Sequence, residues 1–92
     1  MKRLTISLAL ITAAVPAMAD EIDRLGGYRV GKVLAHSWQT RIDVARAGQA
    51  RFGLSENQMT SFLACLKGAA RMMPEPTLKR AAKECGPIAK GN

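Results

Sequence analysis

The sequence predicts a small all-α domain of three helices, two of which form a hairpin closed by a disulfide bond between Cys65 and Cys85. Three observations lead to this expectation. Apolar residues recur at helical spacings of three and four along most of the chain. Residue types that begin and end helices stand between these stretches. The two cysteines fall on the last two stretches, and no segment has the alternating pattern of a β-strand.

Residues 1–19 are expected to be a cleavable secretory signal peptide. Two basic residues follow the initial methionine, an uncharged apolar run comes next, and an A-x-A site ends at Ala19. The alternative is an uncleaved membrane anchor, but a bilayer span takes about 20 apolar residues and this run is shorter. The domain would then be residues 20–92, with a net charge two lower than the +7 of the whole chain.

Export places the protein in the periplasm or the medium, where two cysteines normally pair. The separation of Cys65 and Cys85 excludes a C-x-x-C redox motif. A bond between them closes a loop of about twenty residues and stabilises the fold by about 3 kcal/mol in the chain-entropy model. A metal pair, two free thiols and an intermolecular bridge are the alternatives. At this length the domain gains much from such a crosslink.

The first elements follow directly after the expected cleavage site. Residues 20–25 fit one or two helical turns, ended by the adjacent Gly26 and Gly27. Residues 30–52 fit one long helix, and Gly53 suits the position just beyond its end. Its apolar stripe is expected to pack across the hairpin and consists of Val30, Leu34, Trp38, Ile42, Ala45 and Phe52.

The second helix has the clearest start signal in the chain. Ser55 suits its N-cap, and Gln58 three residues later completes a capping box. Leu54 and Met59 occupy the two positions of a hydrophobic staple. The helix is expected to continue to Pro74, because the residue before a proline is pushed out of helical geometry. Its apolar stripe is Met59, Phe62, Leu63, Leu66, Ala70 and Met73.

The third helix is expected to begin near Pro76 and to end at Gly86 and Pro87. The cysteine positions agree with an antiparallel hairpin. Cys65 lies seven residues before Met72, and Cys85 lies seven residues after Leu78. Since each helical residue rises 1.5 Å, the two thiols should reach the same height.

Catalytic and metal-binding patterns are weak, so we expect neither an enzyme nor a bound cofactor. His36 lies on the polar face of its helix; a relay to Asp43 is geometrically conceivable, but a solvated surface histidine is the simpler interpretation. Met59, Met72 and Met73 together with His36 raise the alternative of a copper site. Methionines at helical spacing usually fill a core instead.

The favoured function is that of an exported, non-enzymatic interaction protein, which binds another protein or a second copy of itself through a helix face. Trp38 and Arg41 are the candidate contact residues, because tryptophan and arginine are enriched among binding hot spots. The alternative for Trp38 is a core anchor. The alternative for Arg41 is a stem that packs on the core while its head stays in water.

A second hypothesis is a basic protein that binds a membrane surface or an anionic polymer such as a glycan. It depends on basic residues that the hairpin would bring to one side, although such groups are often only a solvated face. Nucleic acid is not expected, because no aromatic residues are interleaved with this group. The group consists of Lys67, Arg71, Lys79, Arg80 and Lys83.

Overall fold

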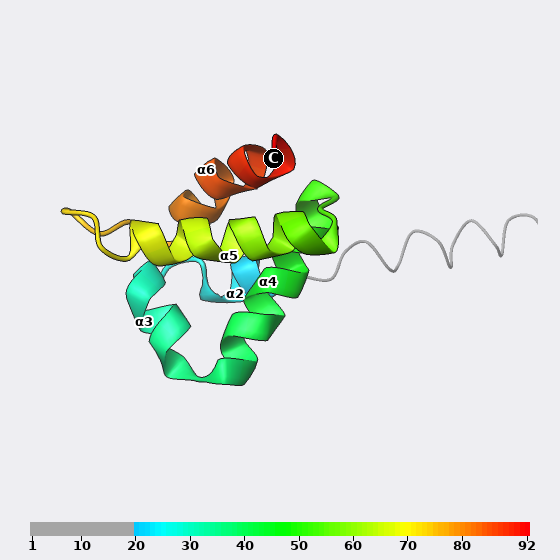
Figure 1. Ribbon diagram of the computed structural model, residues 1–92. Coiled ribbons are helices and arrows are strands. Elements are labelled where there is room, and N and C mark those ends of the chain that lie inside the picture. Colours follow the sequence, from blue (N-terminus) through cyan, green and yellow to red (C-terminus); the bar gives the residue numbers. More distant parts are fainter. Residues whose placement is uncertain (1–19) are drawn as a thin grey trace, which may run out of the picture.

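The computed structural model describes residues 20–92, so the expected signal peptide lies outside the described residues. Within residues 20–92 the chain is helical, with no strand and one isolated bridge between Arg29 and Thr77 (Figure 1). The all-α class is confirmed, whereas the expected number of three helices is too low. The five helices of this part of the chain are α2 (Glu21–Leu25), α3 (Val30–His36), α4 (Trp38–Phe52), α5 (Glu56–Ala69) and α6 (Leu78–Lys90).

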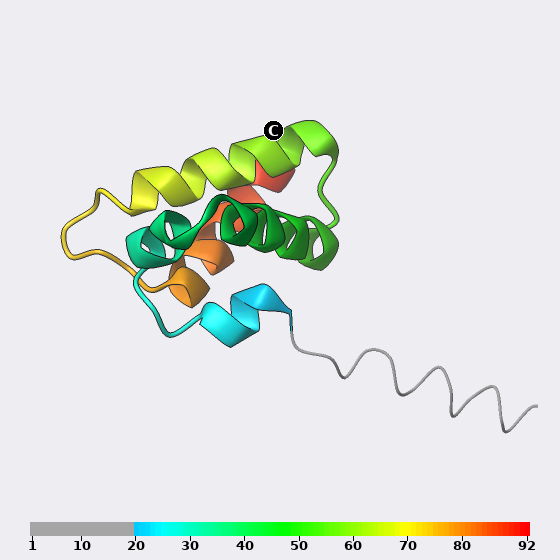
Figure 2. The same cartoon turned by 90° about the horizontal axis from the view of Figure 1, so that it is seen from below.

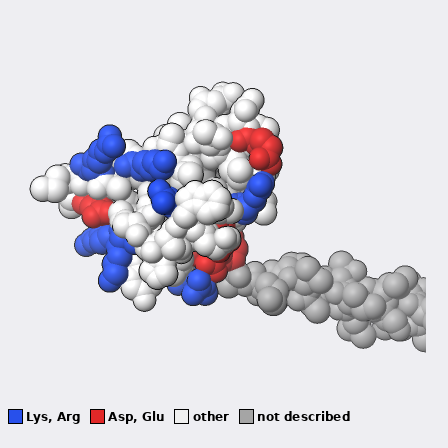
Figure 3. Space-filling model, turned by 60° about the horizontal axis from the view of Figure 1, so that its bottom comes forward, with Lys and Arg blue, Asp and Glu red and all other residues white. Residues whose placement is uncertain are grey.

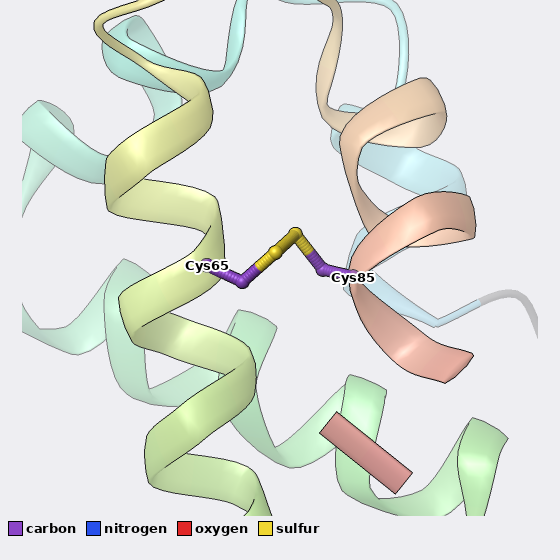
Figure 4. Close-up of a disulfide and its surroundings, with 2 residues drawn as sticks. All are labelled: Cys65 and Cys85. Atoms are coloured by element: carbon purple, nitrogen blue, oxygen red, sulfur yellow. A yellow bond between two sulfur atoms is a disulfide. The ribbon is translucent and has the colours of Figure 1, made fainter. Parts of the chain in front are cut away.

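Helices α5 and α6 form the expected antiparallel hairpin (Figures 1 and 2). The disulfide between Cys65 and Cys85 is confirmed, with the two Cα atoms 5.7 Å apart, and it bridges α5 and α6 away from the helix ends (Figure 4). The capping box at the start of α5 is also confirmed. Ser55 Oγ accepts from the Gln58 amide at 3.1 Å, and Gln58 Oε1 accepts from the Ser55 amide at 2.9 Å. Helix α5 ends at Ala69, earlier than expected.

Helix α6 continues through Gly86 and Pro87 to Lys90, so its expected end was wrong. Tertiary contacts hold the extra turn, which buries Ala89. The side-chain amide of Gln58 donates to the Lys90 carbonyl at 3.0 Å, and Lys90 Nζ donates to the Gly53 carbonyl at 2.6 Å. The partners come from α5 and from the turn before it, so sequence signals within α6 cannot show them.

The long helix expected over residues 30–52 is broken at Ser37, which separates α3 from α4. Ser37 is extended, with φ −167° and ψ 163°, and its side chain accepts from the Thr40 amide at 3.0 Å. This is an N-cap that ends one helix axis and begins another. The apolar stripe is therefore divided, and Trp38 begins α4 instead of continuing the stripe of α3. Gly53, with φ 67°, ends α4 as expected.

The core lies where α2, α3, α4, α5 and α6 meet, and two phenylalanines pack against each other there. Phe62 of α5 is fully buried and lies over Gly48 of α4. Phe52 of α4 lies over Gly86 of α6, and the two rings are 5.9 Å apart. Each glycine lets a neighbouring aromatic ring approach the backbone of its helix. The largest fully buried side chains are Phe62, Ile22, Leu66, Leu78, Val30 and Val44.

Candidate functional site

A groove between α4 and α5 joins several of the residues singled out from the sequence. Its volume is about 240 Å³, and its walls combine apolar with basic side chains. The residues that line this α4–α5 groove are Trp38, Arg41, Ile42, Ala45, Arg46, Met59, Leu63 and Lys67.

Trp38 is the most exposed of the groove's apolar side chains, with 69% of its surface accessible. Its position follows from the break at Ser37, since the first residue of a new helix need not continue the stripe of the previous one. The interpretation of Trp38 as a core anchor is therefore wrong. A tryptophan left this open presents a large amphipathic surface to a partner or to solvent.

Arg41 lies beside Trp38 and is half-buried. Its Nε–H is shielded from solvent and has no hydrogen-bond acceptor among residues 20–92. A buried donor without an acceptor costs about 1–3 kcal/mol. Arg41 thus brings a guanidinium group to the groove, although its shielded Nε–H is left without an acceptor among residues 20–92.

The charge of the groove is entirely basic, since it contains two arginines and a lysine but no carboxylate. Arg46 is partly neutralised by Glu56, which it contacts at 3.0 Å. Hydrogen bonds from Gln49 and Arg46 hold the pKa of Glu56 below its ordinary value. Within the described residues, Arg41 and Lys67 have no such salt bridge.

The basic residues proposed from the sequence do not form one surface. Lys67 belongs to the α4–α5 groove, whereas Lys79, Arg80 and Lys83 line a separate open hollow on α6 of about 580 Å³. Arg71 lines neither hollow and lies in the loop after α5. Figure 3 shows one face, on which basic side chains lie in separate groups with uncharged surface between them.

Some groove residues were not recognised as site candidates from the sequence. Met59, Leu63 and Ile42 were assigned to the core, and the structure leaves all three half-buried along the groove. Helical periodicity separates an apolar face from a polar one, but it cannot show which part of that face a neighbouring helix covers.

A third hollow, of about 310 Å³, lies where α2, α3 and α4 meet and includes Tyr28, Lys32 and His36. Lys32 Nζ lies 5.4 Å from the centre of the Tyr28 ring. His36 Nδ1 is 3.2 Å from Thr40 Oγ1, while Asp43 accepts from Gln39. The conceivable His36–Asp43 relay is therefore not formed. Among residues 20–92 no three histidine, cysteine or acidic side chains are grouped closely enough to hold a metal ion.

No protein-family model, curated protein or solved structure matches this chain. Within the described residues, no helix has the length and apolar character needed to cross a bilayer. The disulfide indicates an oxidising environment, because such bonds rarely persist in the cytoplasm.

Proposed function

We propose that the protein is an exported, non-enzymatic binding protein of the periplasm or the medium. It holds a segment of another protein in the α4–α5 groove. The segment carries apolar side chains for the groove floor and an acidic side chain for Arg41.

Trp38 is the observation that carries this proposal. It is large, largely exposed and placed at the rim of a groove with apolar walls. Exposed tryptophans beside arginines are typical of binding hot spots. On binding, apolar side chains of the partner would pack against the Trp38 ring and against Ile42 and Leu63, which are half-buried in the free protein.

Charge complementarity favours an acidic partner. The groove has no carboxylate of its own, and Arg41 offers a desolvated donor without an acceptor. A carboxylate from the partner would pair with the guanidinium of Arg41 by a charge-assisted hydrogen bond, which is stronger than a neutral one. A second copy of this chain is the other occupant to test.

The test compares Arg41→Glu with the wild type in two measurements. Complexes captured from an extract of the exporting cells identify the partner, whose affinity is then measured with purified proteins. Arg41→Glu should weaken binding at least tenfold, because it places a like charge against the partner's carboxylate. Reversing that carboxylate on the partner should restore binding to Arg41→Glu.

Lys83→Glu is the matched control, since it makes the same charge change on α6 outside the groove. It should leave binding within twofold of wild type at physiological salt. Because Arg41 is half-buried, Trp38→Ser serves as a second groove variant whose exposed position preserves the fold. The proposal is wrong if Lys83→Glu weakens binding as much as Arg41→Glu, or if Trp38→Ser has no effect. Concentration-dependent sedimentation abolished by Arg41→Glu would instead identify a second copy as the occupant.

A further inference from the structure

The loop between α5 and α6 projects beyond the ends of the helices, as Figures 1 and 2 show. Three consecutive exposed residues of this loop, which we call the hairpin tip, are Met72, Met73 and Pro74. Met73 is 94% exposed and Met72 is 57% exposed. Two large apolar side chains held out in solvent side by side are not explained by the core or by the α4–α5 groove.

Four basic residues lie in this loop, contact it or follow it in the chain, and we call them the basic collar. Arg71 immediately precedes the tip. Arg29 donates to the Glu75 carbonyl at 2.7 Å, and this hydrogen bond fixes the Arg29 side chain against the part of the loop that leads into α6. Lys79 and Arg80 lie in the first turn of α6, and both side chains are exposed.

The base of the loop is firmly attached to the domain. The Val30 amide donates to the Pro76 carbonyl at 3.1 Å, and the Leu78 amide donates to the Tyr28 carbonyl at 2.8 Å. The carboxylate of Glu75, the one acidic side chain of the loop, accepts from the Gly31 amide at 2.6 Å. It therefore points back to α3 rather than outward with the methionines.

The arrangement is an apolar point backed by positive charge. In Figure 3 the left end of the molecule is uncharged, and lysine and arginine side chains lie behind it, above and below, together with one acidic patch. A convex tip cannot enclose a small ligand. It can enter the boundary between headgroups and acyl chains, while basic side chains behind it reach anionic headgroups.

We infer that the hairpin tip and the basic collar form a membrane-contact site for an anionic bilayer. Met72 and Met73 enter the interfacial region, where their flexible side chains adapt to disordered lipid. The collar supplies the electrostatic attraction, and each basic residue near an anionic surface strengthens binding about fivefold. The site lies at the opposite end of α5 from Glu56 and its partner Arg46.

Sedimentation of the purified protein with vesicles tests this inference. The vesicles contain phosphatidylglycerol with phosphatidylcholine, or phosphatidylcholine alone. The protein should sediment with the first and not with the second, and added salt should release it. Met72→Ser/Met73→Ser should lower the partition coefficient about tenfold, because it removes most of the apolar transfer. Arg71→Gln/Arg80→Gln should lower it about 25-fold, fivefold for each charge.

Two matched controls locate the effect. Ile88→Ser removes an apolar side chain that is 58% exposed but lies near the other end of α6, and it should change partitioning less than twofold. Arg46→Gln removes one positive charge beside Glu56, the first residue of α5, and it should have a much smaller effect than Arg71→Gln alone.

The inference is overturned if the serine variant binds like the wild type, or if Arg46→Gln and Arg71→Gln weaken binding equally. It is also overturned if a soluble anionic polysaccharide binds the protein as tightly as the vesicles do and if Met72→Ser/Met73→Ser does not weaken that binding. That result would identify a general polyanion surface. Circular dichroism should show unchanged helix content in every variant, since all the altered side chains are exposed.

Discussion

The α5–α6 hairpin and the α3–α4 corner are both pairs of consecutive helices, joined by residues 70–77 and by Ser37 respectively, and different interactions hold them. In the hairpin, a disulfide joins the two helices. At the corner, a single serine hydroxyl caps α4, and the carboxylate of Glu75 reaches the start of α3 from another part of the chain. The hairpin thus carries its own crosslink, whereas the corner depends on what packs around it.

This difference also separates the two candidate surfaces. The hairpin exposes its apolar residues at the loop, where Met72 and Met73 project from a crosslinked support. The corner exposes Trp38 because the helix axis changes direction at Ser37. A rigid support suits insertion of a small tip into a bilayer, while a corner set by packing places a larger side chain at the edge of a groove.

Among the variants that distinguish the hairpin from the corner, removal of the disulfide should cause the largest loss in the free energy of unfolding. Cys65→Ala/Cys85→Ala should lower the free energy of unfolding by about 3 kcal/mol, because the unfolded chain regains the entropy of an open loop of about twenty residues. Urea unfolding followed by circular dichroism measures this loss. Reduction of the wild type should give a loss of similar size. Equal stability of the reduced and oxidised wild type would show that the hairpin, like the corner, is held by noncovalent contacts alone.

Replacing either of two buried glycines by alanine should cause the next largest change in the free energy of unfolding. Helix propensity alone makes glycine to alanine favourable by about 1 kcal/mol. At Gly48, however, a Cβ would overlap the fully buried Phe62 ring, so Gly48→Ala should destabilise by about 2 kcal/mol. At Gly86 the new Cβ would lie 2.5 Å from the Phe52 ring, which is half-buried and can shift, so the loss should be about 1 kcal/mol.

Gly68 is the matched control for these two glycines, because a Cβ there meets nothing within 4 Å. Gly68→Ala should raise the free energy of unfolding by about 0.5–1 kcal/mol through helix propensity alone. Thermal unfolding of the three variants distinguishes the effects by sign. A gain at Gly48 would mean that the contact between α4 and α5 is looser than the structure describes.

The helix caps are expected to have an effect about as large as the one at Gly86. Ser37→Ala and Ser55→Ala should each lower the free energy of unfolding by about 1 kcal/mol, since each removes an acceptor for an N-terminal amide. Helix content should stay constant in Ser37→Ala, because buried Val33 and Val44 fix the directions of α3 and α4. A gain in both stability and helical circular dichroism would show that residues 30–52 form one helix once the cap is absent.

The sequence predicted best where local chemistry decides the structure. Ser55 and Gln58 form their capping box, Gly53 ends α4, and the two cysteines meet at the expected height. Ser37 was a missed signal, because a serine inside an apolar periodic stretch also fits the polar face of a continuous helix. The end of α6 was mispredicted because the last turn is held by Gln58 and by the Gly53 carbonyl, which are distant in sequence.

For the candidate site, the sequence identified Trp38, Arg41 and Lys67 but not that they share one groove with Met59 and Leu63. It also grouped basic residues that the structure divides between the groove, the α6 hollow and the loop. Residue type determines what a side chain can bind. Its neighbours are determined by how helix faces meet.

By itself, then, the sequence determined the helical class, the disulfide hairpin and the start of α5, because helix periodicity, capping and loop closure act over short distances along the chain. Only the tertiary structure decided that the α3–α4 segment turns, that Trp38 and the methionine tip are exposed, and that α6 runs past Pro87. The physical reason is burial. Each of these outcomes depends on which apolar surface another helix covers, and that surface comes from residues far apart in the chain.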